Sequence, residues 1–484
     1  MIRAATLYNS LHGPGAPHLD FEMWASTNPN RSSPTQHKTR ARSIHSVPRS
    51  TIHFMTRKSS NALLGYSQAA AFVAKRAKRL ARSKPTTERV PLAAAAGRVL
   101  AETLRADSDQ PPFARSTRDG FACRAADASA HQPLALAGAS RAGDPPSGPL
   151  PRGAVWEIMT GAPVPRGADA VIMLEHIENA GPASAPTVRL LPPRSIEKGE
   201  NIVLRGAQAR KGDALLPAGT LIGAAQIALA ASCGCTELKV FARPRVAILS
   251  TGDELVPIAA KPAPGQIRNS SSAMLAAMVA AAGGEPWILP IARDTAKSLD
   301  AALARAVTAE LLLITGGVSA GKFDLVEPAL ARAGARFHFT GVRMQPGKPL
   351  VFGERRIGTN PNQKLRSMQS RSMQWFFGLP GNPVSSAVTF LLFAAPVLAA
   401  LACRLDLGPR FALARLAKDV KTKPGLTRFL PAACTFRGPV PEVKLIPWQG
   451  SGDLAAMALA NCYLVVPDEP GSLEAGAMVN ILLA

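Results

Sequence analysis

The sequence predicts a multi-domain α/β and β protein, and three observations lead to this fold class. Between residues 245 and 353, aliphatic strand-like runs alternate with helical segments, which implies a parallel sheet with helices on both faces. Residues 110–196 instead resemble short strands and turns rich in Pro, Gly and Ala. The last residues, 404–484, have the pattern of short strands in a small β-barrel or sandwich. We therefore expect a central α/β domain together with smaller β-rich domains.

The residues before the α/β domain are expected to form two domains. A helix-containing linker domain is predicted from 61–109 plus 197–240, and a β-rich insertion domain from 110–196. Apolar residues at helical spacing predict helices at 67–83, 89–105 and 221–234. The first of these helices has a basic face, which is typical of a membrane-surface helix but more often of the solvated face of an ordinary domain.

The α/β domain is predicted at 241–403, and its elements follow from local patterns. Aliphatic runs predict strands within 245–256, 285–294, 311–314, 335–353 and 375–383. Alanine-rich amphipathic segments predict helices at 272–284 and 296–310. Residues 384–403 are uncharged and long enough to span a membrane. Ser385, Ser386 and Pro396 within this stretch favour a core helix instead.

One strand-to-helix junction, "LLLITGGVSAGKFDLVEPAL" at 311–330, combines glycines with an acid. Gly316 and Gly317 can serve only to turn the chain, since glycine adopts positive φ. Alternatively, backbone N–H groups at such a turn bind an anion, and Asp324 holds a divalent cation against a phosphate. Polar turns of this kind, "STGDE", "TGGVSAGKFD", "QPGKP" and "GLPGNP", follow several predicted strands. Because strand ends of a parallel sheet share one rim, their convergence favours the anion site.

The net charge of +23 invites a nucleic-acid function, but its distribution argues against one. Residues 1–87 contribute +12 and residues 355–373 contribute +5, which leaves +6 for the rest of the chain. We interpret the charge as that of an N-terminal extension and a basic insert. Neither stretch interleaves aromatic side chains as a stacking platform for bases would. We expect neither nucleic-acid nor membrane binding.

The N-terminal residues and the cysteines bear on localisation. Residues 1–60 are basic and are expected to be a disordered tail, a transit peptide, or the product of a start assigned too early, with Met55 as the true start. The six cysteines show no repeated CxxC and no Cys/His metal spacing. Reduced thiols in a cytoplasmic protein are therefore expected.

Several motifs in one order resemble a known family. These are "STRDGFA", "MTGAPVPRGADAV", "STGDELV", "TGGVSAGKFD", "PGKP", "GLPGNPVS", "GSGDL" and a "YLVVP" segment, and they extend over residues 62–484. The set is similar to the molybdopterin molybdenumtransferases, the MoeA and gephyrin E-domain family. The resemblance implies a three-layer α/β/α, MogA-like molybdopterin-binding domain and a C-terminal small β-barrel domain. It also implies an enzyme that inserts molybdate into adenylylated molybdopterin, releases AMP and forms molybdenum cofactor.

The resemblance implies site residues as well. Glu254 and Asp324 would hold Mg²⁺ and would be catalytic together with Asp119 and Lys348. Asp119 and Thr160 would reach the cleft of a partner subunit in a homodimer with shared active sites. The substrate nucleotide would contact Ser250, Gly252, Asp253, Thr160, Gly316, Gly317, Ser319, Gly321, Pro380, Gly381 and Asn382, and molybdate would contact Lys348, Ser385 and Ser451.

Some positions depart from the family pattern. Gln345 stands where a lysine is frequent, Ala207 and Gln208 where an acidic pair is frequent, and Leu426 and Pro431 where basic residues are usual, although Arg428 lies between them. The acids also have a plainer interpretation as helix caps. Two alternatives to the enzyme remain open: a molybdopterin-binding relative without turnover, and a scaffold protein. Contacts with other proteins of cofactor biosynthesis are compatible with each of these functions.

Overall fold

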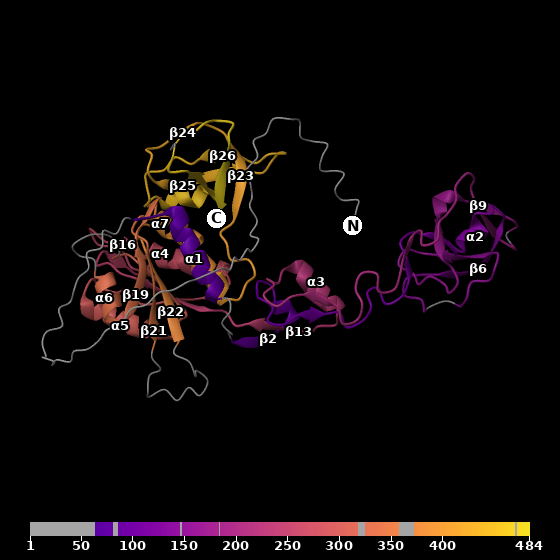
Figure 1. Ribbon diagram of the computed structural model, residues 1–484, viewed down its shortest axis with the longest axis horizontal. Coiled ribbons are helices and arrows are strands. Elements are labelled where there is room, and N and C mark those ends of the chain that lie inside the picture. The colour runs from indigo at the N-terminus through magenta and orange to yellow at the C-terminus, as the bar shows by residue number, and fades with distance from the viewer. Residues whose placement is uncertain are drawn as a thin grey trace, which may run out of the picture. The chain divides into compact units, whose positions relative to one another are not determined.

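The computed structural model shows several regions, each built on its own strands (Figure 1). The expected extension, residues 1–60, lies outside the described residues. Residues described by the structure are 63–80, 86–145, 148–182, 184–317, 325–357, 372–469 and 472–484.

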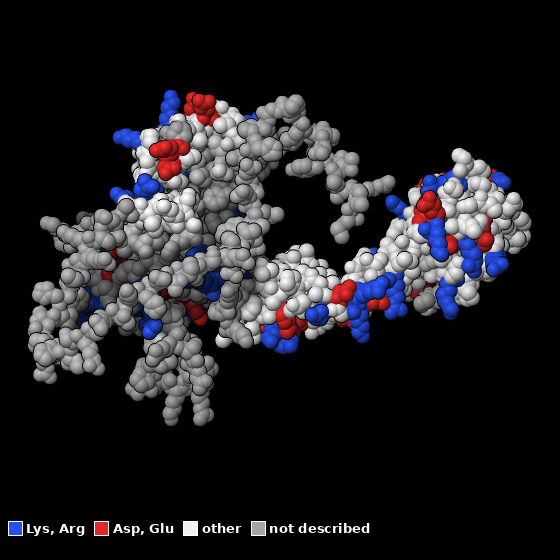
Figure 2. Space-filling view, in the orientation of Figure 1, with Lys and Arg blue, Asp and Glu red and all other residues white. Residues whose placement is uncertain are grey.

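Lys and Arg side chains are mixed with Asp and Glu side chains on the described surface in Figure 2. Most of the two strongly basic stretches found in the sequence, 1–87 and 355–373, lies outside the described residues. The part of the chain that the structure describes therefore shows no broad surface of one charge sign in this view. All six cysteines are free thiols, and four of them are buried.

The α/β region is built on a six-stranded sheet with the order β17-β14-β18-β22-β21-β19. Alternate residues of a strand point to opposite faces of a sheet. Accordingly, Leu311 and Leu313 pack in one hydrophobic core, and Leu312 and Ile314 pack in the other. Helices α4, α7 and α8 contribute to the first core, and α5 and α6 contribute to the second. The expected three-layer α/β/α architecture is confirmed.

Its elements include the apolar helices and the strands predicted from the sequence. They are β14 (Arg245–Ser250), β15 (Leu255–Val256), β16 (Ile267–Arg268), α4 (Ser270–Ala281), β17 (Glu285–Ile288), α5 (Ala296–Arg305), η3 (Ala306–Thr308), β18 (Leu311–Thr315), α6 (Val326–Arg332), β19 (Ala335–Thr340), β21 (Val351–Ile357), β22 (Ser372–Leu379), α7 (Pro383–Thr389), η4 (Phe390–Ala394) and α8 (Ala395–Leu401).

Two features of this sheet differ from the sequence prediction. Strands β14, β17, β18 and β22 run parallel, but β21 is antiparallel to β22, and β19 is antiparallel to β21. The sheet is therefore mixed, because a hairpin and not a helical crossover joins β21 to β22. The continuous helical segment α7–η4–α8, Pro383–Leu401, is apolar enough to span a membrane by composition, and 83% of its most apolar window is buried inside the protein.

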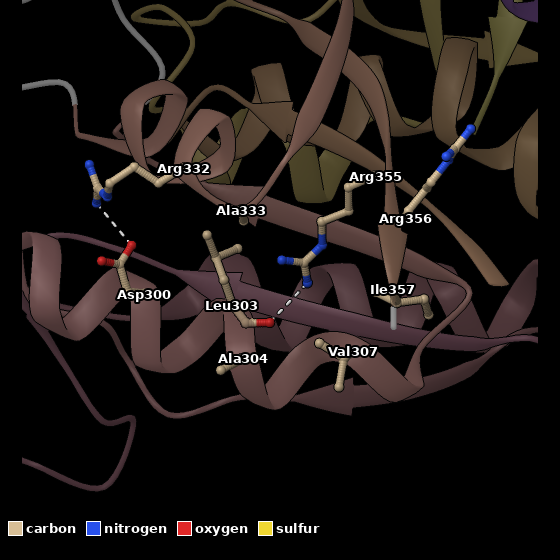
Figure 3. A pocket seen from close by; sticks show the side chains of 9 residues that line it. All are labelled: Asp300, Leu303, Ala304, Val307, Arg332, Ala333, Arg355, Arg356 and Ile357. Atoms are coloured by element: carbon tan, nitrogen blue, oxygen red, sulfur yellow. Dashed lines mark hydrogen bonds and ion pairs between the residues drawn. The ribbon is translucent and has the colours of Figure 1, made fainter. Parts of the chain in front are cut away.

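The basic insert predicted at 355–373 begins and ends within strands. Arg355 pairs with Gln374 across the β21–β22 hairpin, and residues 358–371 lie outside the described residues. The Arg355 side chain is buried, and burial lowers its pKa to about 10. It donates to Gln374 Oε1 at 2.7 Å. It also donates to Leu303 O at 2.9 Å, as Figure 3 shows. Gln374 in turn donates to Ala306 O and Ala309 O.

These contacts give Arg355 a structural function. The carbonyl groups at the end of a helix carry partial negative charge, and a cation there is stabilising. The hairpin base therefore caps the end of α5 and η3. Beside it lies a pocket of about 370 Å³ lined by Asp300, Leu303, Ala304, Val307, Arg332, Ala333, Arg355, Arg356 and Ile357.

The C-terminal region contains a closed five-stranded barrel. Its strands follow the order β25-β26-β23-β29-β27, and β27 pairs back with β25. Two strands from earlier in the chain extend this sheet, because β20 pairs with β25 and β1 with β20. The elements are β1 (Leu64–Gly65), α1 (Tyr66–Leu80), β20 (Val342–Gln345), β23 (Phe411–Leu416), β24 (Val420–Lys421), β25 (Thr427–Thr435), β26 (Glu442–Leu445), α9 (Leu454–Leu459), β27 (Cys462–Val466), β28 (Ser472–Leu473) and β29 (Met478–Leu483).

Helix α1, which the expected linker domain includes, packs against the α/β region. Its buried residues Ala69 and Val73 belong to the core that also contains Leu398 of α8. Phe72 makes an edge contact with Phe352 of β21. The apolar face of α1 is therefore covered by the α/β region.

The linker region is smaller and contains fewer helices than predicted. It comprises β2 (Thr87–Pro91), η1 (Leu92–Ala94), β3 (Leu104–Arg105), β12 (Ala214–Leu216), α3 (Ala224–Ser232) and β13 (Glu237–Phe241). The helix predicted at 89–105 is wrong. Val90 pairs with Leu238 across β2 and β13, and Gly97 turns the chain with a φ of 73°. Strand pairing and burial of Val90 override the helical propensity of the alanines.

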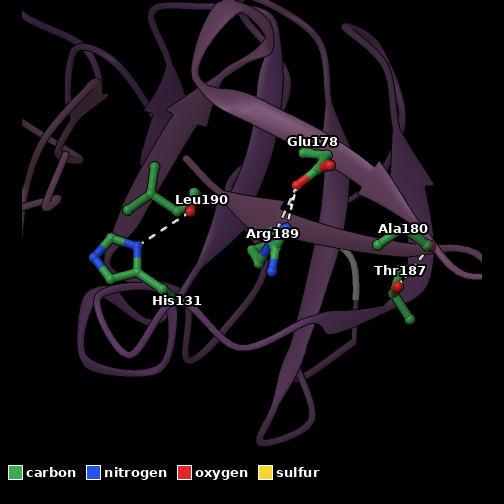
Figure 4. Close-up of polar contacts among 6 residues, drawn as sticks. All are labelled: His131, Glu178, Ala180, Thr187, Arg189 and Leu190. Atoms are coloured by element: carbon green, nitrogen blue, oxygen red, sulfur yellow. Dashed lines mark hydrogen bonds and ion pairs between the residues drawn. The ribbon is translucent and has the colours of Figure 1, made fainter. Parts of the chain in front are cut away.

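The β-rich region has a six-stranded sheet of order β8-β5-β7-β6-β10-β9. Some of its side-chain contacts join neighbouring strands, as Figure 4 shows for Arg189 with Glu178 and for Thr187 with the Ala180 carbonyl. The elements are β4 (Arg115–Ser116), β5 (Gly120–Cys123), α2 (Ala125–Ala128), β6 (Leu134–Ser140), β7 (Ala154–Ile158), β8 (Ala170–Met173), η2 (Leu174–His176), β9 (Ile177–Ala180), β10 (Thr187–Leu190) and β11 (Ile202–Val203).

Candidate active site

Three of the predicted polar turns meet at one edge of the α/β sheet. Ser250 at the end of β14 is in register with Thr315 of β18, and Thr315 is in register with Leu379 of β22. The turns that follow these strands therefore leave the sheet side by side. This confirms the expectation that "STGDE", "TGG" and "GLPGNP" share one rim.

The fourth turn, "QPGKP", lies near this rim for a different reason from the one predicted. It follows β20, which belongs to the barrel sheet and not to the α/β sheet. It leads, however, into β21, whose first residue Val351 is in register with Gly378 near the end of β22. Because β21 is antiparallel, its beginning lies at the edge where β22 ends. Lys348 is exposed on this turn.

Glycines allow the rim turns to approach one another closely. Gly316 has a φ of 90°, and a Cβ atom there would lie 2.4 Å from Thr251 O. A Cβ atom on Gly381 would lie 3.5 Å from Gly316 Cα. The turn at Gly316 thus lies directly against Thr251, and a side chain at Gly316 would push these two turns apart. At Gly381 the 3.5 Å is an ordinary contact distance. Gly316 therefore does not only turn the chain locally but also allows two loops to pack closely.

Glu254 is the acid on this rim whose carboxylate lies against backbone. The Glu254 carboxylate lies over Gly252: a Cβ atom there would lie 2.4 Å from Glu254 Oε2, and the φ of 151° at Gly252 favours glycine. The neighbouring acids have protein partners. Asp253 pairs with Arg293 at 3.9 Å, and Asp294 accepts from Thr251 Oγ1 at 2.7 Å. Glu254 is exposed and therefore accessible to a ligand.

Ser250 differs from its predicted neighbours because its side chain is buried. Its hydroxyl is 2.7 Å from Ser272 Oγ and donates to Asn269 Oδ1 at 3.2 Å. Asn269 caps α4 by accepting from Ser272 N at 3.1 Å. In this structure Ser250 supports the start of α4, and its contact with a nucleotide remains a prediction.

The "GLPGNP" turn joins the rim to the C-terminal region. Asn382 Nδ2 donates to Ser451 Oγ at 2.8 Å, and Val384 N donates to Ser451 O at 3.1 Å. Thr315 Oγ1 donates to Pro380 O at 3.4 Å, and Ser385 is buried. Ser451 belongs to the "GSGDL" motif, which is distant in sequence, and was predicted to contact molybdate. Its position beside Asn382 follows from tertiary packing and was not foreseen.

Asp119 and Thr160 form a second pair of predicted residues. Asp119 Oδ1 accepts from Thr160 N at 2.6 Å and from Thr160 Oγ1 at 2.9 Å. These two hydrogen bonds lower the pKa of Asp119. Gly120 places this aspartate, because a Cβ atom there would lie 1.8 Å from Ile172 O on the adjacent strand. The prediction that Asp119 and Thr160 share the β-rich region is confirmed.

Comparison with known families agrees with this arrangement. Residues 64–234 match a model described as the MoeA N-terminal region (domain I and II), 247–400 match a probable molybdopterin binding domain, and 413–484 match the MoeA C-terminal region (domain IV). A molybdopterin molybdenumtransferase of Haemophilus influenzae is 32% identical over 400 residues, which are 82% of this chain and 93% of that protein. The chain belongs to the MoeA family.

Two further relatives are similar to this chain over most of its length. A molybdopterin molybdenumtransferase of Nostoc is 37% identical over 322 residues, which are 65% of this chain and 70% of that protein. A crystal structure of a molybdopterin biosynthesis MoeA protein from Pyrococcus horikoshii is 26% identical, has a TM-score of 0.69, and covers 87% of this chain and 100% of that one.

Sequence reasoning passed over one feature of the MoeA-family site. Gln345, where the family often has lysine, is in register with Arg428 of β25 and accepts from its Nε at 3.0 Å. Arg428 also donates to Leu426 O at 3.1 Å and is 8% exposed. A cation therefore stands next to Gln345, although residue 345 itself is neutral. The pairing of β20 with β25 places Arg428 beside Gln345, and this pairing is known only from the three-dimensional structure.

The donor set on the rim fits a magnesium ion only in part. Among the residues described, no group of three or more His, Cys, Asp or Glu side chains converges. Mg²⁺ commonly takes one or two carboxylates together with substrate phosphates and water. The exposed Glu254 supplies one of the two predicted carboxylate ligands. The other predicted ligand, Asp324, lies outside the described residues, as do Ser319 and Gly321.

Proposed function

We propose that this chain inserts molybdate into adenylylated molybdopterin, releasing AMP and forming molybdenum cofactor. The observation that carries the proposal is the rim on which three glycine-containing turns, Glu254 and the Asn382–Ser451 contact come together. Relatives that align with most of the chain are named molybdopterin molybdenumtransferases, which supports an enzyme of cofactor biosynthesis.

The phosphates of the adenylylated substrate would bind at the glycine turns. Gly316, Gly317 and Gly381 are at least partly exposed and carry no side-chain bulk, and N–H groups at such turns attract phosphate oxygens. Gly252, which is buried beside Glu254, is the fourth proposed glycine contact. Glu254 and Asp324 would hold Mg²⁺ against these phosphates. That ion would neutralise phosphate charge as the adenylate is cleaved. Asp253, Pro380 and Asn382 complete the proposed nucleotide contacts.

Molybdate, a tetrahedral dianion, would bind on the side of the rim nearest the barrel. Lys348 supplies an exposed ammonium group, and Ser385 and Ser451 supply hydroxyl groups. Arg428 adds a guanidinium that has only neutral acceptors, Gln345 Oε1 and Leu426 O, among the described residues. A cation with neutral partners retains its attraction for an anion. This arrangement supports a molybdate site despite the neutral residue at 345.

Asp119 and Thr160 would act in the cleft of a second subunit. The proposed protein is a homodimer in the cytoplasm that uses Mg²⁺ and binds neither nucleic acid nor membrane. The hydrogen bonds from Thr160 keep Asp119 ionised and fix its direction. An anion that is already oriented suits a catalytic carboxylate, because it needs no reorganisation during the reaction.

Turnover of defined substrates tests this function. Purified protein receives adenylylated molybdopterin, molybdate and Mg²⁺, and AMP and molybdenum cofactor are measured separately. The proposal expects both products in equal amounts, dependent on molybdate. Tight binding of the substrate without AMP release would favour the non-catalytic binder. Absence of binding would favour a scaffold.

A further inference from the structure

Arg115 of β4 has a half-buried side chain. The Nε atom of Arg115 is buried and has no hydrogen-bond partner. Arg124 and Arg245 share this feature, but each donates from another nitrogen, to Leu150 O and to Thr308 Oγ1 respectively. For Arg115 no such bond and no ion pair is found among the described residues. Burying a donor without a partner is costly, so such a group calls for an acceptor.

Arg115 lines a pocket of about 560 Å³ at the junction of the linker and β-rich regions. Helix α3 contributes Ala228, Leu229 and Ser232 to the lining. Three other polar groups of the lining have protein acceptors: Gln110 Nε2 donates to Cys233 Sγ, Ser108 Oγ to Asp107 Oδ1 and Ser232 Oγ to Leu229 O. For the Gln208 side-chain amide no hydrogen bond is found among the described residues, so Gln208 and Arg115 are the donors left for a ligand. None of the lining residues belongs to a rim turn described above.

The one acid in this pocket is already neutralised. Asp109 forms an ion pair with Arg205 at 2.8 Å and accepts from Lys211 N at 3.0 Å. The Lys211 backbone N–H and the Arg205 side chain lower the pKa of Asp109, and no ion pair between Asp109 and Arg115 is found among the described residues. The charge of Arg115 thus remains uncompensated. Arg355 offers the contrast, because its buried guanidinium is bound by Gln374 and by the end of α5.

We propose that this pocket binds a small tetrahedral oxyanion, such as phosphate, sulfate or molybdate, through Arg115. A guanidinium forms strong charge-assisted hydrogen bonds with such anions. The Gln208 amide, from another segment of the chain, offers a second donor to such an anion. The site is separate from the rim and does not depend on the proposed transferase activity.

The test uses Ala228, an exposed α3 residue in the pocket wall. Ala228→Glu places a carboxylate in the pocket without altering Arg115, and Ala228→Gln is the neutral control of the same size. Both are made in a Lys348→Gln background, so that anion binding at the rim is weakened equally. Phosphate, sulfate and molybdate are titrated separately by calorimetry at constant ionic strength, and acetate serves as a planar anion.

The expected result is saturable binding of one tetrahedral anion per chain in Ala228→Gln, weakened at least about tenfold in Ala228→Glu and in Arg115→Gln. Arg152→Gln removes an exposed charge of the β-rich region and should leave binding unchanged. Hydrogen exchange should show anion-dependent protection at residues 108–116. No saturable binding, equal losses in all variants, or equal affinity for acetate would overturn the proposal. Turnover is not a readout here, so failure leaves the proposed function untouched.

Discussion

Glu254 and Asp119 are the two described carboxylates proposed for the chemistry, and their surroundings differ. Glu254 is exposed on a turn, lies over Gly252, and belongs to a rim assembled from three strands. Asp119 receives two hydrogen bonds from a single residue, Thr160, within one small sheet region. The first carboxylate can adjust to a cation, whereas the second is fixed before any ligand binds.

This difference indicates separate functions for the two regions. A carboxylate that coordinates a metal contributes mainly charge, so its removal should be severe whatever replaces it. A carboxylate that is oriented by hydrogen bonds contributes direction, so its effect should depend on its partner. Substitutions at the two places should therefore give different patterns of loss.

The largest effect is expected at Glu254. Glu254→Gln keeps the size and removes the charge, and turnover should fall at least about 10²-fold, as happens when a charge-stabilising group is lost. Glu285→Gln, at the start of β17, is the matched control and should turn over normally. If Glu254 and Asp324 hold one ion, Asp324→Asn should cost as much alone as in combination with Glu254→Gln. If the double variant instead loses the product of the two single-variant losses in turnover, the two acids act independently and do not hold one ion.

A smaller effect is expected at Thr160. Thr160→Val removes the hydroxyl donor to Asp119 and keeps the backbone donor. Turnover should fall about tenfold, since a hydrogen bond to a charged group is lost. Thr160→Ser restores the donor and should restore the rate. If the Thr160→Val and Thr160→Ser proteins turn over at the same rate, the hydrogen bond from this hydroxyl to Asp119 does not contribute to the reaction.

Arg428 tests the barrel side of the rim. Arg428→Gln should raise the KM for molybdate about five- to tenfold and leave kcat close to normal, because a ground-state contact with the anion is lost. Arg428→Lys keeps the charge and should recover part of the affinity. Fluorescence or calorimetric binding of molybdate provides a second readout. An unchanged KM in a folded Arg428→Gln protein would exclude this residue from the site.

His338 affects stability and not turnover, and its effect should be the smallest. Its side chain is 3% exposed beneath α1, and burial lowers its pKa below the usual 6.5, although Glu354 opposes this shift and Arg76 and Arg336 reinforce it. The folded state thus favours neutral histidine. Stability should be full above about pH 6.5 and should fall as the pH drops below it, because the unfolded chain takes up the proton first.

Thermal unfolding between pH 8 and pH 5.5 checks this direction. His338→Phe should flatten the fall in melting temperature on the acid side, whereas His176→Phe, in the β-rich region, should not. A parent protein more stable at pH 5.5 than at pH 8 would contradict the assignment of a neutral buried histidine.

Local patterns predicted much of this fold, and they failed where partners lie far apart in the chain. The aliphatic runs of β14, β18 and β22 were sufficient to place three turns on one rim. The alanines at 89–105 indicated a helix, but Val90 pairs with Leu238, a contact across 148 positions of sequence. Similarly, Gln345 and Arg428 lie on paired strands but 83 positions apart in sequence, and Asn382 contacts Ser451 across 69 positions. No local spacing encodes such contacts.

The central claim is that the rim acids and Asp119 form one active site across two subunits, and subunit mixing tests it most directly. An Asp119→Ala chain and a Glu254→Ala chain, each inactive alone, are combined and the heterodimer is purified through two affinity tags. In a two-fold dimer with shared clefts, one cleft then carries both lesions and the other carries none. The account predicts that turnover returns, to at most about half of the wild-type rate per dimer. Verified heterodimers without activity would contradict it, because each cleft would then take both groups from the same chain.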